Sequence, residues 1–127
     1  LVGYSIGTGI ASYAASISQP DALILLSPYN NGRDLFNSYF PVFYGPLQYL
    51  IRYPLTSDRY VSTVTCPALV ILSDRDTIVS PGLSRRLIQS FPKPVKVIHF
   101  DTLQHGDIAM NNEVWQAIVS FLNGLHE

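Results

Sequence analysis

A serine flanked by glycines is the first feature of this sequence that could carry chemistry. The segment Gly3-Tyr4-Ser5-Ile6-Gly7 fits the pattern G-x-S-x-G, in which a sharp turn from a strand into a helix exposes the serine hydroxyl. Three fixed residues at about 7% each match by chance in roughly 4 of 100 chains this long. The context adds weight, because residues 1–2 resemble a strand end and a small-residue segment follows. The pattern predicts a nucleophilic serine; the alternative is a Gly/Ser turn without chemistry.

A general base and an acid for this serine follow in the chain. A serine hydroxyl needs a base within hydrogen-bond reach, and an acid must orient that base. The apolar run 68–73 ends at Asp74-Arg75-Asp76, and the run 95–100 is followed by a loop that contains His105. Loops at the carboxyl ends of parallel strands meet at one edge of a sheet, where such sheets bind ligands. We therefore expect a triad of Ser5, His105 and an aspartate, with Asp76 and Asp74 both available as the acid.

The strands that must position these groups are apolar runs. Residues 22–27 and 68–73 are continuously apolar, which is typical of strands covered on both faces in a parallel sheet. Residues 95–100 include Lys96 and His99 and are predicted to lie nearer a sheet edge. Helical patterns alternate with these runs, so we expect an α/β fold with right-handed crossovers. The four strands should lie in consecutive order, with the strand at residue 2 on one side of the sheet.

Helix signals separate the strands. Segment 7–18 is rich in small residues that allow close approach to a sheet. Ser80 and Pro81 predict the N-cap and first residue of a helix. Asn112 and Glu113 are predicted to open the last helix. Two apolar stripes at helical spacing accompany these signals: Leu83, Leu87, Ile88 and Phe91 in the first of these helices, and Val114, Ile118, Leu122 and Leu125 in the second.

Four segments together resemble the C-terminal half of an α/β-hydrolase. They are GYSIGTG at 3–9, LILLSP at 23–28, CPALVILSDRDTIVSP at 66–81 and HGD at 105–107. The resemblance is to the branch of serine aminopeptidases, monoglyceride lipases and depalmitoylase-like hydrolases. In that branch the acid follows its strand as G-x-x-D-x-x-V, which implies Asp76 as the acid. Ser73 replaces the usual glycine of this pattern, and Gly106 stands where asparagine is common.

The predicted function is hydrolysis through a covalent acyl-enzyme. Ser5 would attack a carbonyl, His105 would transfer the proton, and the backbone N–H of Ile6 would donate to the oxyanion. This chemistry needs no cofactor and no metal. We expect a small-molecule acyl substrate with an ester, thioester or small amide bond. Asp107 would either support the His105 loop or cap a turn.

The span 29–62 is predicted to be a lid-like insertion. Nine of the chain's 15 aromatic residues lie there, and a crossover would need fewer residues. These rings could form a lid or acyl pocket, part of the core, or a surface for a partner. The candidate pocket or lid residues are Tyr4, Phe36, Tyr39, Phe40 and Phe43.

Composition excludes other classes of protein. The 127 residues are 47% hydrophobic and 13% charged with a net charge of -1, so no nucleic-acid partner is expected. The single cysteine, Cys66, is expected to be a small buried hydrophobe and argues against a disulfide or a cysteine zinc site. We expect one domain spanning 1–127, N-terminally truncated, with the second oxyanion donor and any membrane anchor in upstream sequence. Such a chain should tend to self-associate, and its compartment is left open.

Two other functions compete with hydrolysis. One is a non-catalytic binding protein of the same fold, against which the presence of all three triad residue types argues. The other is a phosphate or nucleotide site formed by the glycines that precede the first helix. The dinucleotide pattern G-x-G-x-x-G, begun at Gly7 and Gly9, would need a glycine where Ser12 stands, and the chain has no Walker-type Gly-Lys-Ser/Thr.

Overall fold

Four parallel strands form the centre of the structure, a computed structural model that describes residues 1–39 and 54–127. The strands are β1 (Val2–Tyr4), β2 (Leu23–Leu26), β3 (Ala68–Ser73) and β4 (Lys96–Phe100). They lie in the order β1-β2-β3-β4, and each adjacent pair is parallel. The predicted parallel sheet with strands in sequence order is therefore confirmed.

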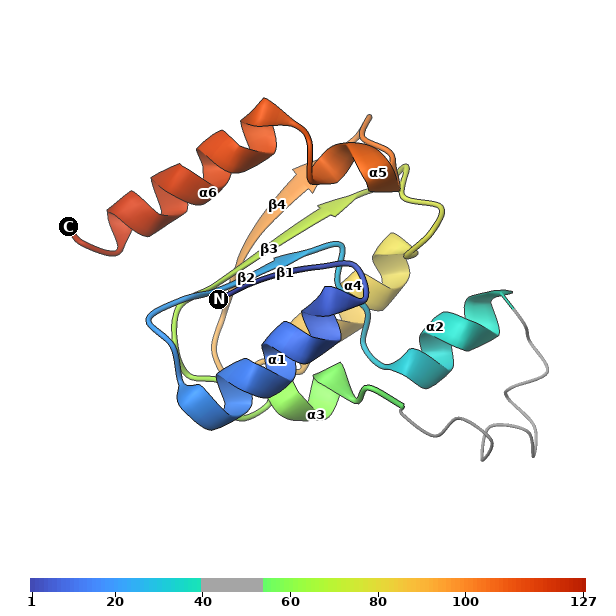
Figure 1. Cartoon of the computed structure of the whole chain (residues 1–127), viewed down its shortest axis with the longest axis horizontal. Coiled ribbons are helices and arrows are strands. Elements are labelled where there is room, and N and C mark those ends of the chain that lie inside the picture. The colour runs from blue at the N-terminus through green and yellow to red at the C-terminus, as the bar shows by residue number, and fades with distance from the viewer. Residues whose placement is uncertain (40–53) are drawn as a thin grey trace.

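Helices cover both faces of this sheet (Figure 1). The described helices are α1 (Gly7–Ser18), α2 (Gly32–Tyr39), α3 (Ser57–Val61), α4 (Pro81–Gln89), α5 (His105–Ile108) and α6 (Asn112–Gly124). Helices α1, α3 and α4 lie on one side of the sheet, whereas α5 and α6 lie on the other (Figure 1). No helix among the described residues has both the length and the apolar character that a bilayer span requires.

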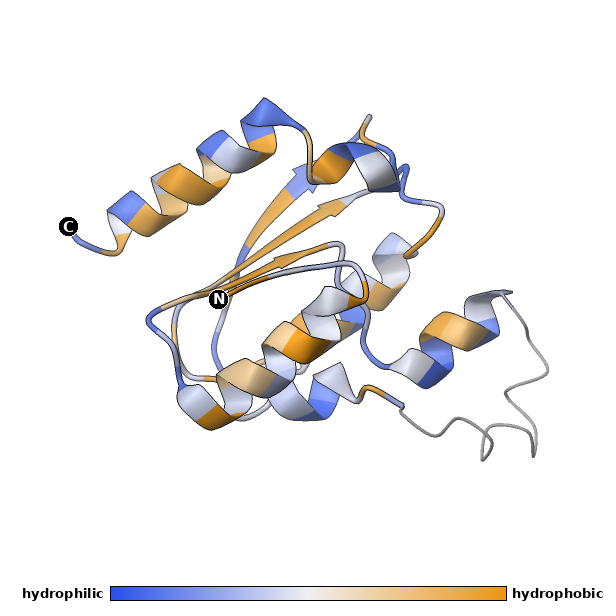
Figure 2. Ribbon diagram, viewed as in Figure 1, coloured by the Kyte–Doolittle hydropathy of each residue, from blue (hydrophilic) through white to orange (hydrophobic). Residues whose placement is uncertain are grey.

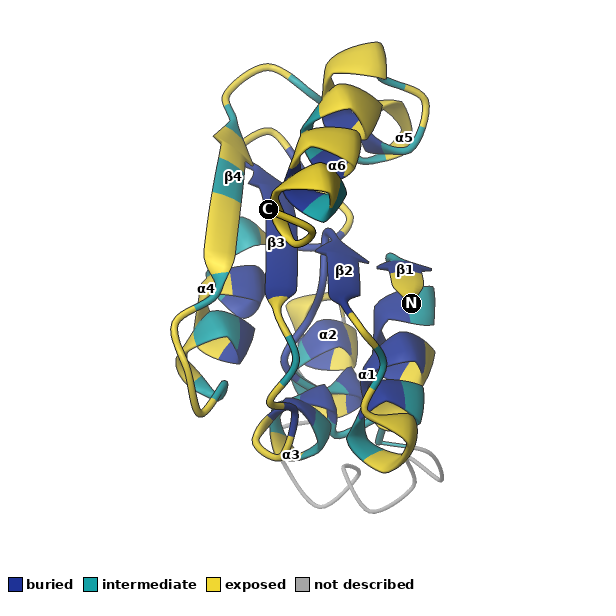
Figure 3. Ribbon diagram, turned by 90° about the vertical axis from the view of Figure 1, so that its left-hand side faces the viewer, coloured by how far each residue is buried: buried dark blue, intermediate teal, exposed yellow. Residues whose placement is uncertain are grey.

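The central strands are apolar on both sides because each side meets a helical layer. Leu23 and Leu25 of β2 pack with Leu87 of α4, and the alternate residues Ile24 and Leu26 pack with Ile118 of α6. Successive side chains of a strand point to opposite faces, so a continuous apolar run supplies two cores. Figure 2 shows the apolar colour along these strands, and Figure 3 shows β2 and β3 fully buried.

Strand β4 is more exposed than β2 and β3, and it lies at one end of the described sheet. Lys96, Val97 and His99 are exposed, and no other described strand lies beyond β4 (Figure 3). The prediction that this mixed sequence lies near an edge is therefore confirmed.

The helix ends follow the sequence signals with two corrections. Ser80 caps α4 through its side chain, and Pro81 is the first helical residue, as predicted. Helix α6 begins at Asn112, but the capping side chain is that of Asn111, whose oxygen accepts the N–H groups of Glu113 and Val114. The predicted stripe wrongly includes Leu125, which is 38% exposed because α6 ends at Gly124.

The segment between β2 and β3 has a buried residue near each end. Tyr29 is fully buried with Leu35, Val79 and Leu83, and Val61 of α3 is buried among side chains of the sheet and α1. Helix α2 lies between these points, and residues 40–53 fall outside the described part of the chain. The prediction of a lid over 29–62 stays a prediction.

Candidate active site

Ser5 occupies a sharp turn between β1 and α1. Its backbone has φ 54°, a left-handed conformation that costs energy for a residue with a Cβ. The Ser5 N–H donates to the carbonyl of Leu26 at 3.0 Å, which holds the turn against β2. A Cβ at Gly3 would lie 2.7 Å from that of Ala11, so only glycine permits this approach of β1 to α1. The turn thus has the strained strand-to-helix geometry that the sequence predicted.

His105 is the first residue of α5 and reaches the Ser5 side chain. Its Nε2 lies 2.9 Å from Ser5 Oγ, and its ring is mostly buried. Gln104 and Asp107 form a reciprocal capping arrangement at the start of α5, in which Asp107 Oδ2 accepts the Gln104 N–H at 3.1 Å. Asp107 therefore caps the helix turn that carries His105, one of the two roles expected for it.

Asp76 contacts the other nitrogen of the His105 ring. Asp76 is 5% exposed, and its Oδ2 lies 2.8 Å from His105 Nδ1. Its Oδ1 accepts the backbone N–H groups of Ile78 and Val79 at 3.0 and 2.8 Å. A carboxylate only accepts hydrogen bonds, so Nδ1 carries the proton and Nε2 is left to accept from the Ser5 hydroxyl. The structure thus brings Asp76, and not Asp74, to His105.

Ile6 is the N-cap of α1, where the first backbone N–H groups lack acceptors within the helix. This is the position at which the sequence predicted an oxyanion donor. The hydroxyl of Tyr29 donates to the Ile6 carbonyl at 3.2 Å, and burial raises the pKa of Tyr29 to about 12. The sequence analysis missed this anchor, because nothing in the chain near Tyr29 indicates a contact with residue 6.

The predicted pocket residues have different environments. The Tyr4 ring stacks on His105, with 5.2 Å between ring centroids, and the Tyr4 hydroxyl donates to the His105 carbonyl at 2.6 Å. Phe36 and Tyr39 are both more than 40% exposed on α2, and the Tyr39 hydroxyl donates to the carbonyl of Ile78. Burial, and secondarily the Asp76 charge, raise the pKa of Tyr39. Phe40 and Phe43 lie outside the described residues.

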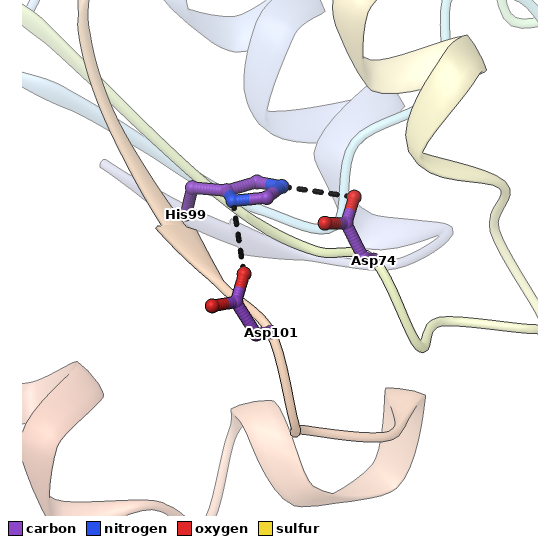
Figure 4. A group of neighbouring side chains, drawn as sticks. All are labelled: Asp74, His99 and Asp101. Atoms are coloured by element: carbon purple, nitrogen blue, oxygen red, sulfur yellow. Dashed lines mark ion pairs between the residues drawn. The ribbon is translucent and has the colours of Figure 1, made fainter.

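A second ionic cluster lies beside the loop that carries Asp76. His99 Nε2 lies 2.9 Å from Asp74 Oδ1, and His99 Nδ1 lies 3.5 Å from Asp101 Oδ1 (Figure 4). The hydrogen bond from His99 lowers the pKa of Asp74, and Arg85 contacts the same carboxylate at 3.1 Å. The sequence analysis predicted a position near a sheet edge for the segment that contains His99 and kept Asp74 as a second candidate acid, but it missed the pairing of these two residues. The parallel register of β3 and β4 could have indicated it, since it places Leu72 beside His99.

This cluster has the residue types of a cation site but the arrangement of ion pairs. One ligand atom from each of Asp74, His99 and Asp101 lies within 4.8 Å of the others. The two carboxylates, however, face different ring nitrogens, so one ion could not take the place of both contacts (Figure 4). The Arg85 guanidinium also neutralises Asp74. The contacts therefore describe a surface ion-pair network.

Two hollows of the described surface lie away from the serine. A cavity of about 220 Å³ is lined by residues of α2, α3 and their approaches, and a second hollow lies over the outer side of α6. None of Ser5, Asp76 and His105 lines either of them.

Comparison with known structures shows that this chain has the α/β-hydrolase fold. The meta-cleavage product hydrolase of Pseudomonas fluorescens superimposes with a TM-score of 0.72 at 18% identity, over 97% of this chain and 64% of the other. An acetyl xylan esterase from Paenibacillus superimposes with a TM-score of 0.69 at 15% identity, over 93% of this chain and 43% of the other.

Among curated proteins, the relatives are much longer than this chain. An uncharacterized protein of Mycobacterium tuberculosis is 30% identical over 105 residues, which are 83% of this chain and 37% of that protein. The lysophosphatidylserine lipase ABHD12 of Mus musculus is 31% identical over 67% of this chain and 25% of its own length. No family model matches the chain. The lipase and the structural neighbours fit hydrolase activity, and the coverage fits the predicted resemblance to one part of an α/β-hydrolase.

Proposed function

We propose that this chain carries the catalytic triad of a serine hydrolase. The observation that carries the proposal is the continuous contact from Asp76 through His105 to Ser5, with distances of 2.8 and 2.9 Å. These residues come from turns after three different strands, so a chance alignment of all three is improbable. The hydrolase relatives support the same reaction class.

Each triad atom has a defined part in the proposed reaction. Ser5 Oγ bonds to the substrate carbonyl carbon while its proton passes to His105 Nε2. The carbonyl electron pair moves to oxygen, which accepts a hydrogen bond from the Ile6 N–H. Collapse of this intermediate expels the leaving group, which takes the proton from His105. Water then attacks the acyl-enzyme by the same route and regenerates Ser5.

We propose an apolar acyl group on the scissile bond. The aromatic segment after β2 supports this choice, because Phe36 and Tyr39 are exposed on α2 and the Tyr39 hydroxyl reaches the Ile78 carbonyl, two residues from Asp76. The similarity to a lysophosphatidylserine lipase makes a single-chain lipid ester one candidate.

A fluorophosphonate probe tests the triad directly, since it labels only an activated serine. The whole protein that contains this chain should label, and Ser5→Ala should abolish labelling. Ser16→Ala is the matched control, because Ser16 is a serine of α1 whose hydroxyl donates locally to the Tyr13 carbonyl. Undiminished labelling of a folded Ser5→Ala protein would disprove the assignment.

Substrate preference is tested with p-nitrophenyl esters of increasing acyl length. Lost apolar contacts change discrimination by only about 1–3 kcal/mol, so preference should be graded. Replacement of Phe36 and Tyr39 by alanine, and separately of Phe40 and Phe43, should lower activity on long acyl esters more than on short ones. A profile unchanged by all four substitutions would assign these rings to the core or to a partner surface.

A further inference from the structure

The tyrosine that precedes Ser5 makes two contacts with His105 that the triad chemistry does not require. Tyr4 ends β1, and its hydroxyl donates to the His105 carbonyl at 2.6 Å across 101 residues of sequence. The same ring stacks on the imidazole, with centroids 5.2 Å apart and planes inclined by 23°. The side chain thus holds both the backbone and the ring of His105.

We propose that Tyr4 is a positioning residue that stabilises the protonated form of His105 and fixes its orientation. The proposal rests on the proposed function, because protonation of His105 matters only if that residue is the base. An aromatic face attracts a cation that lies within about 6 Å of the ring centroid. His105 becomes that cation each time Ser5 loses its proton, so the Tyr4 ring stabilises the step in which charge develops.

The other polar and charged groups near His105 contact it in different ways from Tyr4. Asp76 contacts Nδ1 from the loop after β3, Ser5 contacts Nε2, and Asp107 lies on α5 itself. Tyr39 of α2 donates to the Ile78 carbonyl, two residues from Asp76. Among the aromatic contacts of the described residues, Tyr4 is the ring that stacks on the imidazole. Burial, and then the charges of Asp76 and Asp107, raise the pKa of Tyr4, so its phenol stays neutral and keeps its donor.

Substitutions at residue 4 can distinguish the effect of the hydroxyl from that of the ring. Tyr4→Phe removes the hydroxyl and keeps the ring, so turnover should fall about fivefold with little change in the acid limb of the pH profile of kcat/KM. Tyr4→Leu removes the ring as well, so the midpoint of that limb should shift to lower pH by about 0.5 unit. Incorporation of pentafluorophenylalanine at position 4 keeps the ring shape and removes its negative face, so it should produce the same downward shift. This third variant keeps the test informative if Tyr4→Leu does not fold.

The test uses the whole protein and adds two readouts to the pH profile of kcat/KM. The first is fluorophosphonate labelling rate against pH, and the second is the NMR titration of the His105 Hε1 resonance, assigned by its loss in His105→Gln. Tyr13→Leu is the control. It removes the aromatic contact between Tyr13 of α1 and Tyr60 of α3, and it should leave both midpoints unchanged. If wild-type Ser5 does not label, the proposed function fails, while the NMR titration still tests the Tyr4 contact. If labelling occurs but the His105 midpoints of wild type, Tyr4→Leu and the fluorinated variant coincide, the Tyr4 proposal is overturned.

Discussion

At the scale of single residues, Asp76 is distinguished from Asp74 by its surroundings. Asp76 is buried and accepts two backbone N–H groups in addition to facing His105. Asp74 is exposed and faces His99 and Arg85. The two carboxylates are only two positions apart in sequence, yet one is fixed in the interior and the other belongs to a surface network.

This difference predicts unequal effects on turnover. Asp76→Asn should lower kcat by about 10⁴-fold, as replacement of a triad acid does elsewhere, because the imidazole is held in the wrong tautomer. Asp74→Asn should change kcat by less than about fivefold, since exposed ion pairs contribute little. Steady-state kinetics with a p-nitrophenyl ester measures both. The reverse ordering would transfer the role of acid to Asp74.

Close packing also explains why residue 9 is a glycine. A Cβ at Gly9 would collide with the hydroxyl of Tyr29, which donates to the Ile6 carbonyl. Gly9→Ala should therefore reduce the free energy of unfolding by about 1–3 kcal/mol. In a Tyr29→Phe background the same change should cost at least about 1 kcal/mol less, because the colliding oxygen is gone.

Urea unfolding of the two single variants and the double variant measures this coupling. Gly7→Ala is the matched control, because a Cβ there meets no described atom within 4 Å. Additive effects of Gly9→Ala and Tyr29→Phe would contradict the proposed collision.

At the scale of elements, the loops after β3 and β4 are tied together. The Ser73 hydroxyl at the end of β3 donates to the carbonyl of Leu103, two residues before His105. The Asp74 N–H donates to the Phe100 carbonyl at 3.0 Å. Ser73 stands where the resembling hydrolases usually have glycine, and here its side chain joins the loop that carries Asp76 to the loop that carries His105.

Ser73→Ala should therefore weaken both stability and turnover. Loss of this donor leaves the Leu103 carbonyl without its partner, which costs about 1–3 kcal/mol of unfolding free energy where the group is buried. We expect kcat to fall while KM changes little, because the substitution loosens the base loop. Chemical denaturation and kinetics measure the two effects. The exposed Ser16→Ala should change stability by no more than about 0.5 kcal/mol, and an equal effect from both variants would contradict the tie.

At the scale of the whole molecule, one side of the described structure is apolar and open. No described strand lies beyond β1, and Val2 is 51% exposed. Four apolar residues of α1 and its N-cap, at helical spacing, are also each at least half exposed: Ile6, Ile10, Tyr13 and Ile17. An unpaired strand beside an apolar helix face is a surface that favours association.

We therefore expect the 127-residue chain, expressed alone, to self-associate through this side. Lysine at Ile10 and Ile17 together should shift it towards the monomer, because two charges would have to be buried in the contact. Size-exclusion chromatography with light scattering measures the mass. Val119→Lys is the control, since Val119 is 53% exposed on α6, which lies on the opposite face of the sheet. A monomeric unsubstituted chain, or an equal effect from the control, would contradict the prediction.

The sequence by itself determined the features that depend on neighbouring residues. The turn around Ser5, the apolar strands β2 and β3, and the Ser80-Pro81 start of α4 all follow from local backbone preferences and side-chain periodicity. These signals also predicted a parallel sheet with the serine, acid and base loops at one edge.

Only the tertiary structure decided which side chains meet. Asp74 and Asp76 both follow β3 closely, and only the resemblance to known hydrolases favoured Asp76. In the structure, the turn after β3 directs Asp76 to His105 and Asp74 to His99. The contacts of Tyr4 with His105, 101 residues away, could not be predicted from the sequence. Such contacts depend on how strands and helices pack, because local sequence carries no information about the distant residue that completes a hydrogen bond or a stacked pair.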